Sequence, residues 1–240
     1  MNGSDSATII NRNKNAINDT DAIKWFKTTY CDRVRQAMSG TPFDVDMLAA
    51  IAYQETGYLW SALIKSGPAE EFLALCVGDS LDESGGRNVF PLDKADLIKA
   101  PGGAEMFAIA RAALEGIASY NSGYRKAAVN PNKFCHGFGI FQYDIQFFKL
   151  APSDPEFFLS QGWKEFGSCT AKVREELVSA MATAYGHAKK ELTDTEMVYV
   201  AIAYNKGSVN THGSFQQGHK DDGVFYGENI SRFLKIARSV

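Results

Sequence analysis

The stretch from Met47 to Gly57 constrains the fold most, because an apolar helical stripe within it ends at a carboxylate. Counting back from Glu55 by three, four and seven positions gives three apolar residues, Ala52, Ile51 and Leu48. In a helix these positions share one face, so the pattern predicts a helix whose core-facing stripe also carries Glu55. Gly57 is well suited to end a helix, which places Glu55 in the final turn.

A glutamate at that position has an unusual electrostatic environment. Partial burial disfavours the charged carboxylate, and so does the negative end of the helix dipole. We therefore expect a raised pKa for Glu55, and a carboxylic acid that keeps its proton near neutral pH can act as a general acid. The alternative interpretation is a glutamate at the rim of the core, half-solvated or paired with one of the 25 lysines and arginines.

The composition limits the classes of function. With 240 residues, 45% of them hydrophobic, the chain can bury a sizeable core as one large domain or two small ones. Its net charge of −3 argues against a nucleic-acid-binding protein, which normally has a basic surface. No run approaches about 18 apolar residues, so no membrane span is predicted. Aromatic residues make up 12% of the chain, and aromatic surfaces suit sugar rings.

The first residues lack the basic and then apolar run of a secretory signal. Either the chain is not exported by that route, or a leader has been removed and a periplasmic or secreted location is expected. The four cysteines are widely spaced and form no C-x-x-C pair: Cys31, Cys76, Cys135 and Cys169. One or two disulfides and four buried thiols are both consistent with this spacing.

Local patterns predict a single, mainly α-helical domain over residues 19–240, preceded by a flexible arm at residues 1–18. The clearest helices are expected at 20–38, 104–119, 170–191, 193–204 and 226–238. Thr41 and Pro42 have the residue types of a helix start, and Thr193 with Glu196 has the spacing of a capping box. Two polar, glycine-containing stretches are predicted to be loops, at 78–92 and 208–223.

Three further segments follow the Glu55 helix in a particular order. They are Gly137-Phe-Gly-Ile-Phe-Gln142, then Ala201-Ile-Ala-Tyr-Asn-Lys-Gly207, then Tyr226 at the last helix. This order resembles the lysozyme superfamily, specifically the lytic transglycosylases and goose-type lysozymes. In that family a glutamate ends a helix, a glycine-led Met-Gln turn follows, and an Ala-Tyr-Asn-x-Gly helix end and a closing tyrosine come later. The resemblance implies a lysozyme-like helical domain, with residues 58–136 as an atypical long insertion between the catalytic helix and the Gly-x-x-Gln turn.

The matches to the family differ in quality from residue to residue. Glu55 is followed by threonine where the family usually has serine, and Phe141 stands in place of methionine. Asp144 is similar to the aspartate that follows this turn in goose-type enzymes. The resemblance implies that Glu55 is the general acid and base, and it makes Asp144 a candidate second carboxylate. The candidate substrate-binding residues are Gln142, Tyr204, Asn205, Tyr226, Phe141 and Tyr58.

Several of these residues also have a purely structural interpretation. Gln142 can brace its own loop, and Tyr204 can be a core tyrosine at a helix end. Asn205 suits a helix C-cap in the left-handed conformation, while its amide or the backbone there contacts the sugar in the functional interpretation. Asp144 can equally be the N-cap of the following helix.

We therefore expect a glycan-cleaving enzyme that acts on β-1,4 linkages between amino sugars, with peptidoglycan as the substrate that the resemblance implies. The alternatives are a chitinase-like hydrolase acting on chitin oligomers or another polysaccharide, and a glycan-binding module without turnover. No cofactor or metal is expected, because the chain has no P-loop or G-x-S-x-G motif and its histidines match no standard zinc spacing. A polysaccharide is the expected partner, and the sequence does not indicate the oligomeric state.

Overall fold

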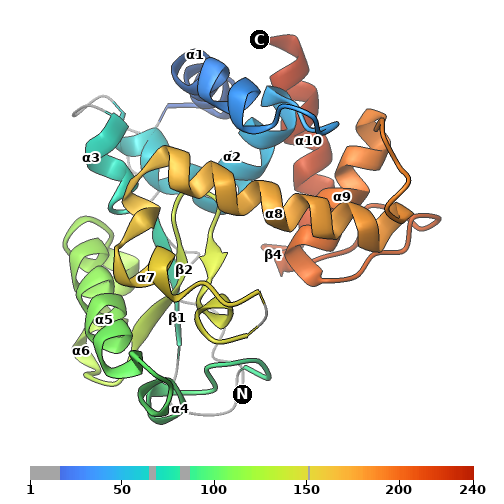
Figure 1. Cartoon of the computed structure of the whole chain (residues 1–240). Coiled ribbons are helices and arrows are strands. Elements are labelled where there is room, and N and C mark those ends of the chain that lie inside the picture. Colours follow the sequence, from blue (N-terminus) through green and yellow to red (C-terminus); the bar gives the residue numbers. More distant parts are fainter. Residues whose placement is uncertain (1–16, 65–68, 82–86, 151) are drawn as a thin grey trace. The chain divides into compact units, whose positions relative to one another are not determined.

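The computed structural model describes residues 17–64, 69–81, 87–150 and 152–240, and these residues are mainly α-helical (Figure 1). The mainly α-helical class predicted from the sequence is confirmed, whereas the predicted arm at 1–18 lies almost wholly outside the described residues. The chain divides into two compact units, which we call the terminal unit (Ile17–Gly57 with Thr170–Val240) and the central unit (Tyr58–Cys169). The sequence predicts one domain over 19–240 with an atypical insertion at 58–136. In the structure, the central unit begins at the same residue, Tyr58, but extends further, to Cys169.

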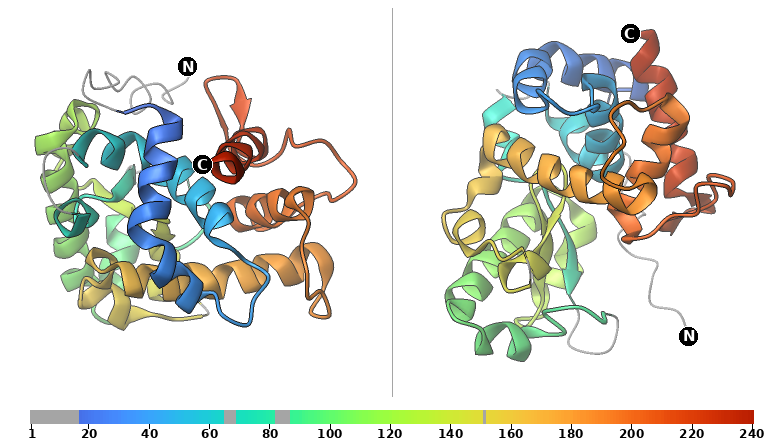
Figure 2. Two further views of the ribbon diagram at one scale, coloured as in Figure 1. Left: turned by 90° about the horizontal axis from the view of Figure 1, so that it is seen from above. Right: turned by 45° about the vertical axis from the view of Figure 1, so that its right-hand side comes forward.

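The terminal unit contains most of the helices that the sequence predicts most clearly. Its elements are α1 (Asp19–Ala37), the first part of α2 (Val45–Leu63), most of α8 (Phe166–Tyr185), α9 (Asp194–Lys206), β4 (Lys220–Asp221), β5 (Val224–Phe225) and α10 (Tyr226–Ser239). α10 packs against both α1 and α9, and α9 and α10 lie side by side in both views of Figure 2. β4 and β5 form a short antiparallel hairpin that leads directly into α10.

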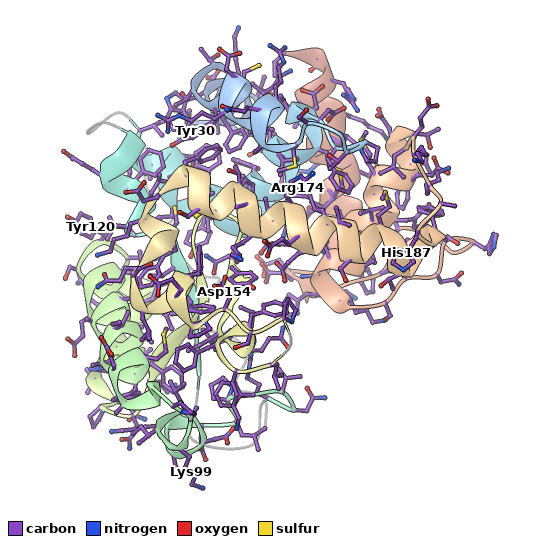
Figure 3. All side chains as sticks on the ribbon, in the orientation of Figure 1. Tyr30, Lys99, Tyr120, Asp154, Arg174 and His187 are labelled. Atoms are coloured by element: carbon purple, nitrogen blue, oxygen red, sulfur yellow. The ribbon has the colours of Figure 1, made fainter. Side chains whose placement is uncertain are left out.

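α1 shows how local sequence sets a helix and its buried face. Asn18 is its N-cap, and the Asn18 side chain accepts a 2.8 Å hydrogen bond from the backbone N–H of Asp21. The buried positions follow the helical period, and they include Ile23, Phe26, Tyr30 and Val34. Tyr30, labelled in Figure 3, is 1% exposed, and its ring lies 5.2 Å from that of Phe26.

The start and end of α2 both differ from the sequence prediction. The helix begins at Val45, and its N-terminal cap is Asp44, whose Oδ1 accepts a 2.9 Å hydrogen bond from the N–H of Met47. The predicted start at Thr41 and Pro42 is therefore wrong. The predicted end at Gly57 is also wrong, because the helix continues to Leu63.

Gly57 has a packing role rather than a helix-ending one. A Cβ at this position would lie 2.5 Å from Cδ2 of Tyr53, so only glycine leaves room for that ring. The tyrosine is fixed at both ends, since its hydroxyl donates a 2.6 Å hydrogen bond to Asp19 and its ring packs edge-on at 4.7 Å from Phe233. Glu55 therefore lies more than two turns before the end of α2, where the helix-terminal dipole does not act on it.

The central unit surrounds a small antiparallel sheet with short helices. The elements are α3 (Ala69–Leu73), β1 (Val77–Leu81), α4 (Lys94–Lys99), α5 (Gly103–Tyr120), η1 (Ser122–Tyr124), α6 (Arg125–Val129), β2 (Phe134–Phe138), β3 (Tyr143–Asp144), η2 (Ile145–Phe148), α7 (Pro155–Leu159) and η3 (Gly162–Lys164). The strand order is β1-β2-β3. α5 packs against β2 and lies beside α4 and α6, as Figure 1 shows in green.

Residues 77–81 form β1, although the sequence predicts a loop from residue 78. The strand exists because β2 pairs with it, with Gly78 opposite Gly137 and Ser80 opposite Cys135. β2 also pairs with β3, which places Gly137 opposite Asp144. A strand that depends on a partner more than fifty residues away has little local signature, so pattern reading missed it.

Aromatic rings fill the core beneath this sheet. Phe138 packs between Phe158 and Trp163, with ring centroids 5.5 Å and 4.8 Å away, and Tyr143 stacks 5.5 Å from Phe158. All four cysteines, which lie among the described residues, are thiols rather than disulfides. No helix within the described ranges combines the length and the apolar character that crossing a membrane requires.

Candidate functional site

The terminal unit brings together two of the site residues predicted from the sequence, Glu55 and Tyr226. The hydroxyl of Tyr226, the first residue of α10, donates a 2.8 Å hydrogen bond to Oε1 of Glu55 on α2. Tyr226 is 3% exposed, while Glu55 is partly exposed. A half-buried carboxyl group is thus held by a buried hydroxyl.

Tyr226 is held in its neutral, donating form. Burial raises its pKa well above 10, and the nearby charges of Glu55 and Tyr204 raise it further. The hydroxyl therefore keeps its proton across the physiological range and has to serve as the donor to Glu55. Because Oε1 of Glu55 accepts the hydrogen bond from Tyr226, the proton of a neutral Glu55 is expected on the other oxygen, Oε2.

The sequence reading missed a second carboxylate close to Tyr226. Glu176 on α8 is partly exposed, and its charge also raises the pKa of Tyr226. It lies between Val173 and Leu177, which are both buried, so it stands at the edge of the apolar face of α8. The stripe before Glu176 is less regular than the one before Glu55, because Lys172 stands four positions before it, so the signal in the sequence is weaker here.

Asn205 lies in the last turn of α9 and is not the C-cap. The C-cap is Gly207, which has φ of 75°, so the prediction of a left-handed Asn205 is wrong. Glycine takes this position because it has no Cβ to clash in the left-handed conformation. The Oδ1 atom of Asn205 instead accepts a 2.9 Å hydrogen bond from the backbone N–H of His219. At the other end of α9, the predicted capping box of Thr193 and Glu196 is confirmed.

In the central unit, Gln142 is bonded within its own turn. It has a positive φ of 55°, and its Nε2 donates a 2.9 Å hydrogen bond to the carbonyl of Gly139 and a 3.4 Å bond to that of Cys76. Its Oε1 lies over the paired strands, because a Cβ at Gly78 or Gly137 would come within 2.5 Å or 2.3 Å of it. The loop-bracing interpretation of Gln142 is therefore confirmed.

The hydroxyls of two tyrosines, Tyr58 and Tyr124, lie close together, and that of Tyr124 lies near Gly78. The hydroxyls of Tyr58 and Tyr124 are 3.2 Å apart, and a Cβ at Gly78 would lie 3.4 Å from the hydroxyl of Tyr124. Tyr58 is 37% exposed, whereas Tyr124 is 7% exposed. Tyr124 was missed by the sequence reading, because the Asn121-Ser-Gly-Tyr124 segment looks like an ordinary turn.

Asp144 is an ion-paired carboxylate. Both of its oxygens bond the guanidinium of Arg87, and Nδ1 of His136 lies 3.2 Å from Oδ2. Burial alone would raise the pKa of Asp144, but the bonds to His136 and Arg87 outweigh it and lower the pKa to about 2. Oδ1 also accepts a 2.7 Å hydrogen bond from the N–H of Gln146, which confirms the N-cap interpretation.

The predicted residues therefore fall into two groups, one in each unit. Glu55, Tyr204, Asn205 and Tyr226 belong to the terminal unit, and Gln142, Asp144, Phe141 and Tyr58 belong to the central unit. Phe141 is 2% exposed and packs 6.2 Å from the ring of Phe166, so it is a core ring of the central unit.

Comparison with protein families, characterised proteins and solved structures finds no match. The site is therefore interpreted from its own chemistry. Across the described part of the chain, no group of three or more His, Cys, Asp or Glu side chains is placed to hold a metal ion. The groups that the structure does place together are carboxyls, phenols and amides, which transfer protons and bind hydroxyl-rich ligands.

Proposed function

We propose that this protein is a lysozyme-like enzyme that cleaves β-1,4 linkages between amino sugars, with peptidoglycan as its substrate. The observation that carries the proposal is the hydrogen bond from Tyr226 to Glu55. It orients a half-buried carboxyl group, as a general acid requires. The order of the Glu55 helix, the Gly139–Gln142 turn and the Ala203–Gly207 segment, which resembles that of the lytic transglycosylases and goose-type lysozymes, adds support.

In the proposed reaction, Glu55 gives its proton to the glycosidic oxygen as the bond from that oxygen to the anomeric carbon breaks. The resulting carboxylate then removes a proton from the oxygen that attacks the anomeric carbon. If water attacks, the product is a reducing sugar, and if the substrate's own 6-hydroxyl attacks, it is an anhydro sugar. The hydrogen bond from Tyr226 stabilises the carboxylate between these steps.

Glu176 is the proposed second carboxylate. Glycoside hydrolysis normally uses two carboxyl groups, one as the acid and the other to stabilise or activate the attacking group. Asp144, the candidate from the sequence, is held by Arg87 and His136 and serves as an N-cap. Glu176 is the better candidate because it lies in the same unit as Glu55 and, like Glu55, raises the pKa of Tyr226 through its charge.

In the central unit, Tyr58 is the proposed sugar contact. Its ring is partly exposed, and its hydroxyl is held by Tyr124, so it presents an aromatic face with a fixed polar edge. Such a face suits the apolar side of a sugar ring. The exposed ring of Tyr58 would equally serve the second candidate function, a glycan-binding module without turnover, because binding a sugar needs no proton donor.

The decisive experiment is digestion of purified peptidoglycan and of chitin oligomers, with mass spectrometry of the products. Glu55→Gln removes the acid and keeps the shape, so cleavage should fall by roughly 10²–10⁴-fold. Glu175→Gln, which changes the charge by the same amount at a 53% exposed position, is the control and should keep full activity. Full activity in Glu55→Gln would overturn the assignment, and glycan binding by the wild type without any product would support the binding module instead.

A further inference from the structure

The loop at residues 208–223 is fastened between the end of α9 and the start of α10. Three backbone contacts hold its second half: the N–H of His219 donates to Asn205, the N–H of Tyr226 donates to the carbonyl of His219 at 2.8 Å, and the N–H of Gly227 donates to the carbonyl of Gln217 at 3.1 Å. His219 is thus bonded through both of its backbone polar groups. One of these bonds leads to α9 and the other to Tyr226.

A close contact reinforces this arrangement at Gly218. Its φ is +86°, and a Cβ there would lie 2.7 Å from Cβ of Tyr226 and 3.0 Å from Oδ1 of Asn205. Backbone atoms of the loop therefore pack directly between Asn205 and Tyr226. A side chain at this position would have to push one of them away.

We propose that Asn205 is a positioning residue that sets Tyr226, and through it Glu55, by holding the backbone of His219. The contacts run from Oδ1 of Asn205 to the N–H of His219, from the carbonyl of His219 to the N–H of Tyr226, and from the hydroxyl of Tyr226 to Glu55. The proposal rests on the proposed function, because the position of Tyr226 affects turnover only if Glu55 transfers a proton.

This role uses only the acceptor side of the Asn205 amide. A residue that recognises a sugar through its amide N–H₂ needs the donor side instead. Aspartate keeps an acceptor oxygen at the same position and lacks the donor, whereas alanine lacks both. Because Asn205 is exposed, the extra charge of an aspartate is solvated. The two substitutions therefore separate positioning from sugar contact.

The first experiment compares the kinetics of Asn205→Ala and Asn205→Asp on peptidoglycan fragments. Asn205→Ala should lower kcat by roughly 10–100-fold with little change in KM, because small misplacements of catalytic groups have effects of this size. Asn205→Asp should restore kcat to within about threefold of the wild type, since it preserves the hydrogen bond. Asn210→Ala is the control, because Asn210 accepts a hydrogen bond from the N–H of His212 in the same loop but does not bond His219. Equal losses in the alanine and aspartate variants, or a rise in KM alone, would overturn the proposal.

The second experiment compares two glycines at which alanine would meet the same backbone strain. Gly218 and Gly223 both have φ of +86°, but no described heavy atom lies within 4 Å of a Cβ placed at Gly223. Gly218→Ala should lower kcat as Asn205→Ala does, and Gly223→Ala should retain it. Similar losses in both alanine variants would show that loop strain, rather than the contact with Tyr226, is responsible.

A readout without substrate separates this proposal from the proposed function. Tyrosine labelled with ¹³C at the phenol carbon gives 10 signals, and Tyr226→Phe identifies the one from Tyr226. In the wild type this phenol should titrate well above pH 10, because burial and Glu55 raise its pKa. In Asn205→Ala and Gly218→Ala it should titrate at lower pH, and in Gly223→Ala it should not change. In Asn205→Asp it should not titrate at lower pH than in the wild type, because the hydrogen bond is kept and the added negative charge raises the pKa of Tyr226 rather than lowering it. An unchanged Tyr226 signal in Asn205→Ala overturns the positioning role, whatever the activity assay shows about Glu55.

Discussion

Tyr226 donates a 2.8 Å hydrogen bond to Oε1 of Glu55 across 171 positions of sequence. The two residues come from the first turn of α10 and the middle of α2. Their contact orients the carboxyl group of a glutamate that lies on an apolar helical stripe.

Tyr226→Phe should lower kcat for glycan cleavage by roughly 10–100-fold, because a hydrogen bond to a charged group contributes about 1.5–3 kcal/mol. The ring stays, so the fold should be kept. Tyr53→Phe is the control, since it removes a 2.6 Å hydrogen bond to Asp19 at a partly buried position and leaves Tyr226 in place. Steady-state kinetics beside circular dichroism measure both effects. Wild-type kcat in Tyr226→Phe would contradict a catalytic role for this contact.

Glu176→Gln should lower kcat more than Glu175→Gln does. Glu176 lies near Tyr226 at the edge of the buried face of α8, whereas Glu175 is 53% exposed and pairs with Lys172 at 2.9 Å. The expected loss is roughly 10²-fold or more if Glu176 supplies the second carboxyl group. The measurement is kcat on peptidoglycan fragments. Identical rates in the two variants would contradict a catalytic role for Glu176.

Asp144 should make the stability depend on pH in the acid range. Its pKa is lowered from the ordinary 3.8 to about 2 in the folded chain. A lowered folded pKa contributes stability above the unfolded value, and that contribution disappears as the pH falls from about 4 to about 2. The shift from 3.8 to about 2 corresponds to about 2.5 kcal/mol, since one pKa unit is about 1.4 kcal/mol.

Asp144→Asn should remove this acid dependence and destabilise the protein at neutral pH by about 2–3 kcal/mol, because Arg87 loses its partner. Urea unfolding at several pH values measures both effects. Asp32→Asn is the control, because the side chain of Asp32 is 99% exposed and lies 3.6 Å from Arg35. An unchanged pH profile in Asp144→Asn would refute the ion-pair interpretation.

The same substitution should have opposite effects at two helical glycines. Gly57→Ala should destabilise the protein by about 1–3 kcal/mol, because its Cβ would meet the anchored ring of Tyr53 at 2.5 Å. Gly116→Ala in α5 should stabilise by about 0.5–1 kcal/mol, since alanine favours a helix and no described heavy atom lies within 4 Å of that Cβ. Thermal unfolding compares the two. A stabilising Gly57→Ala would show that the ring of Tyr53 moves aside.

The four thiols should react at very different rates with a thiol reagent. Cys31 is partly exposed, whereas the other three cysteines are buried, and burial raises the pKa of Cys169 to about 12. One thiol should therefore react rapidly in the folded protein and four after denaturation. Intact-mass measurement of the labelled protein counts them. Fewer than four reactive thiols after denaturation without reductant would mean that a disulfide forms in solution.

The sequence by itself determined the elements whose signals are local. The apolar period of α1 and the Asn18 cap fixed that helix, and the capping box of Thr193 and Glu196 fixed the start of α9. These features are readable because the interacting groups lie within one or two helical turns of one another. The same reasoning named Glu55 and Tyr226 as candidate site residues but could not show that they touch.

The tertiary structure decided everything that depends on distant partners. β1 forms because β2 pairs with it, and a glycine fits within α2 at position 57 because the ring of Tyr53 occupies the space of a side chain. Gly207 rather than Asn205 ends α9, which frees the Asn205 amide to hold His219. Because α2 extends to Leu63, Glu55 does not lie at a helix end, and its raised pKa stays a prediction. Glu55 is instead bonded by Tyr226, and no local pattern encodes this contact because it joins two helices through folding alone.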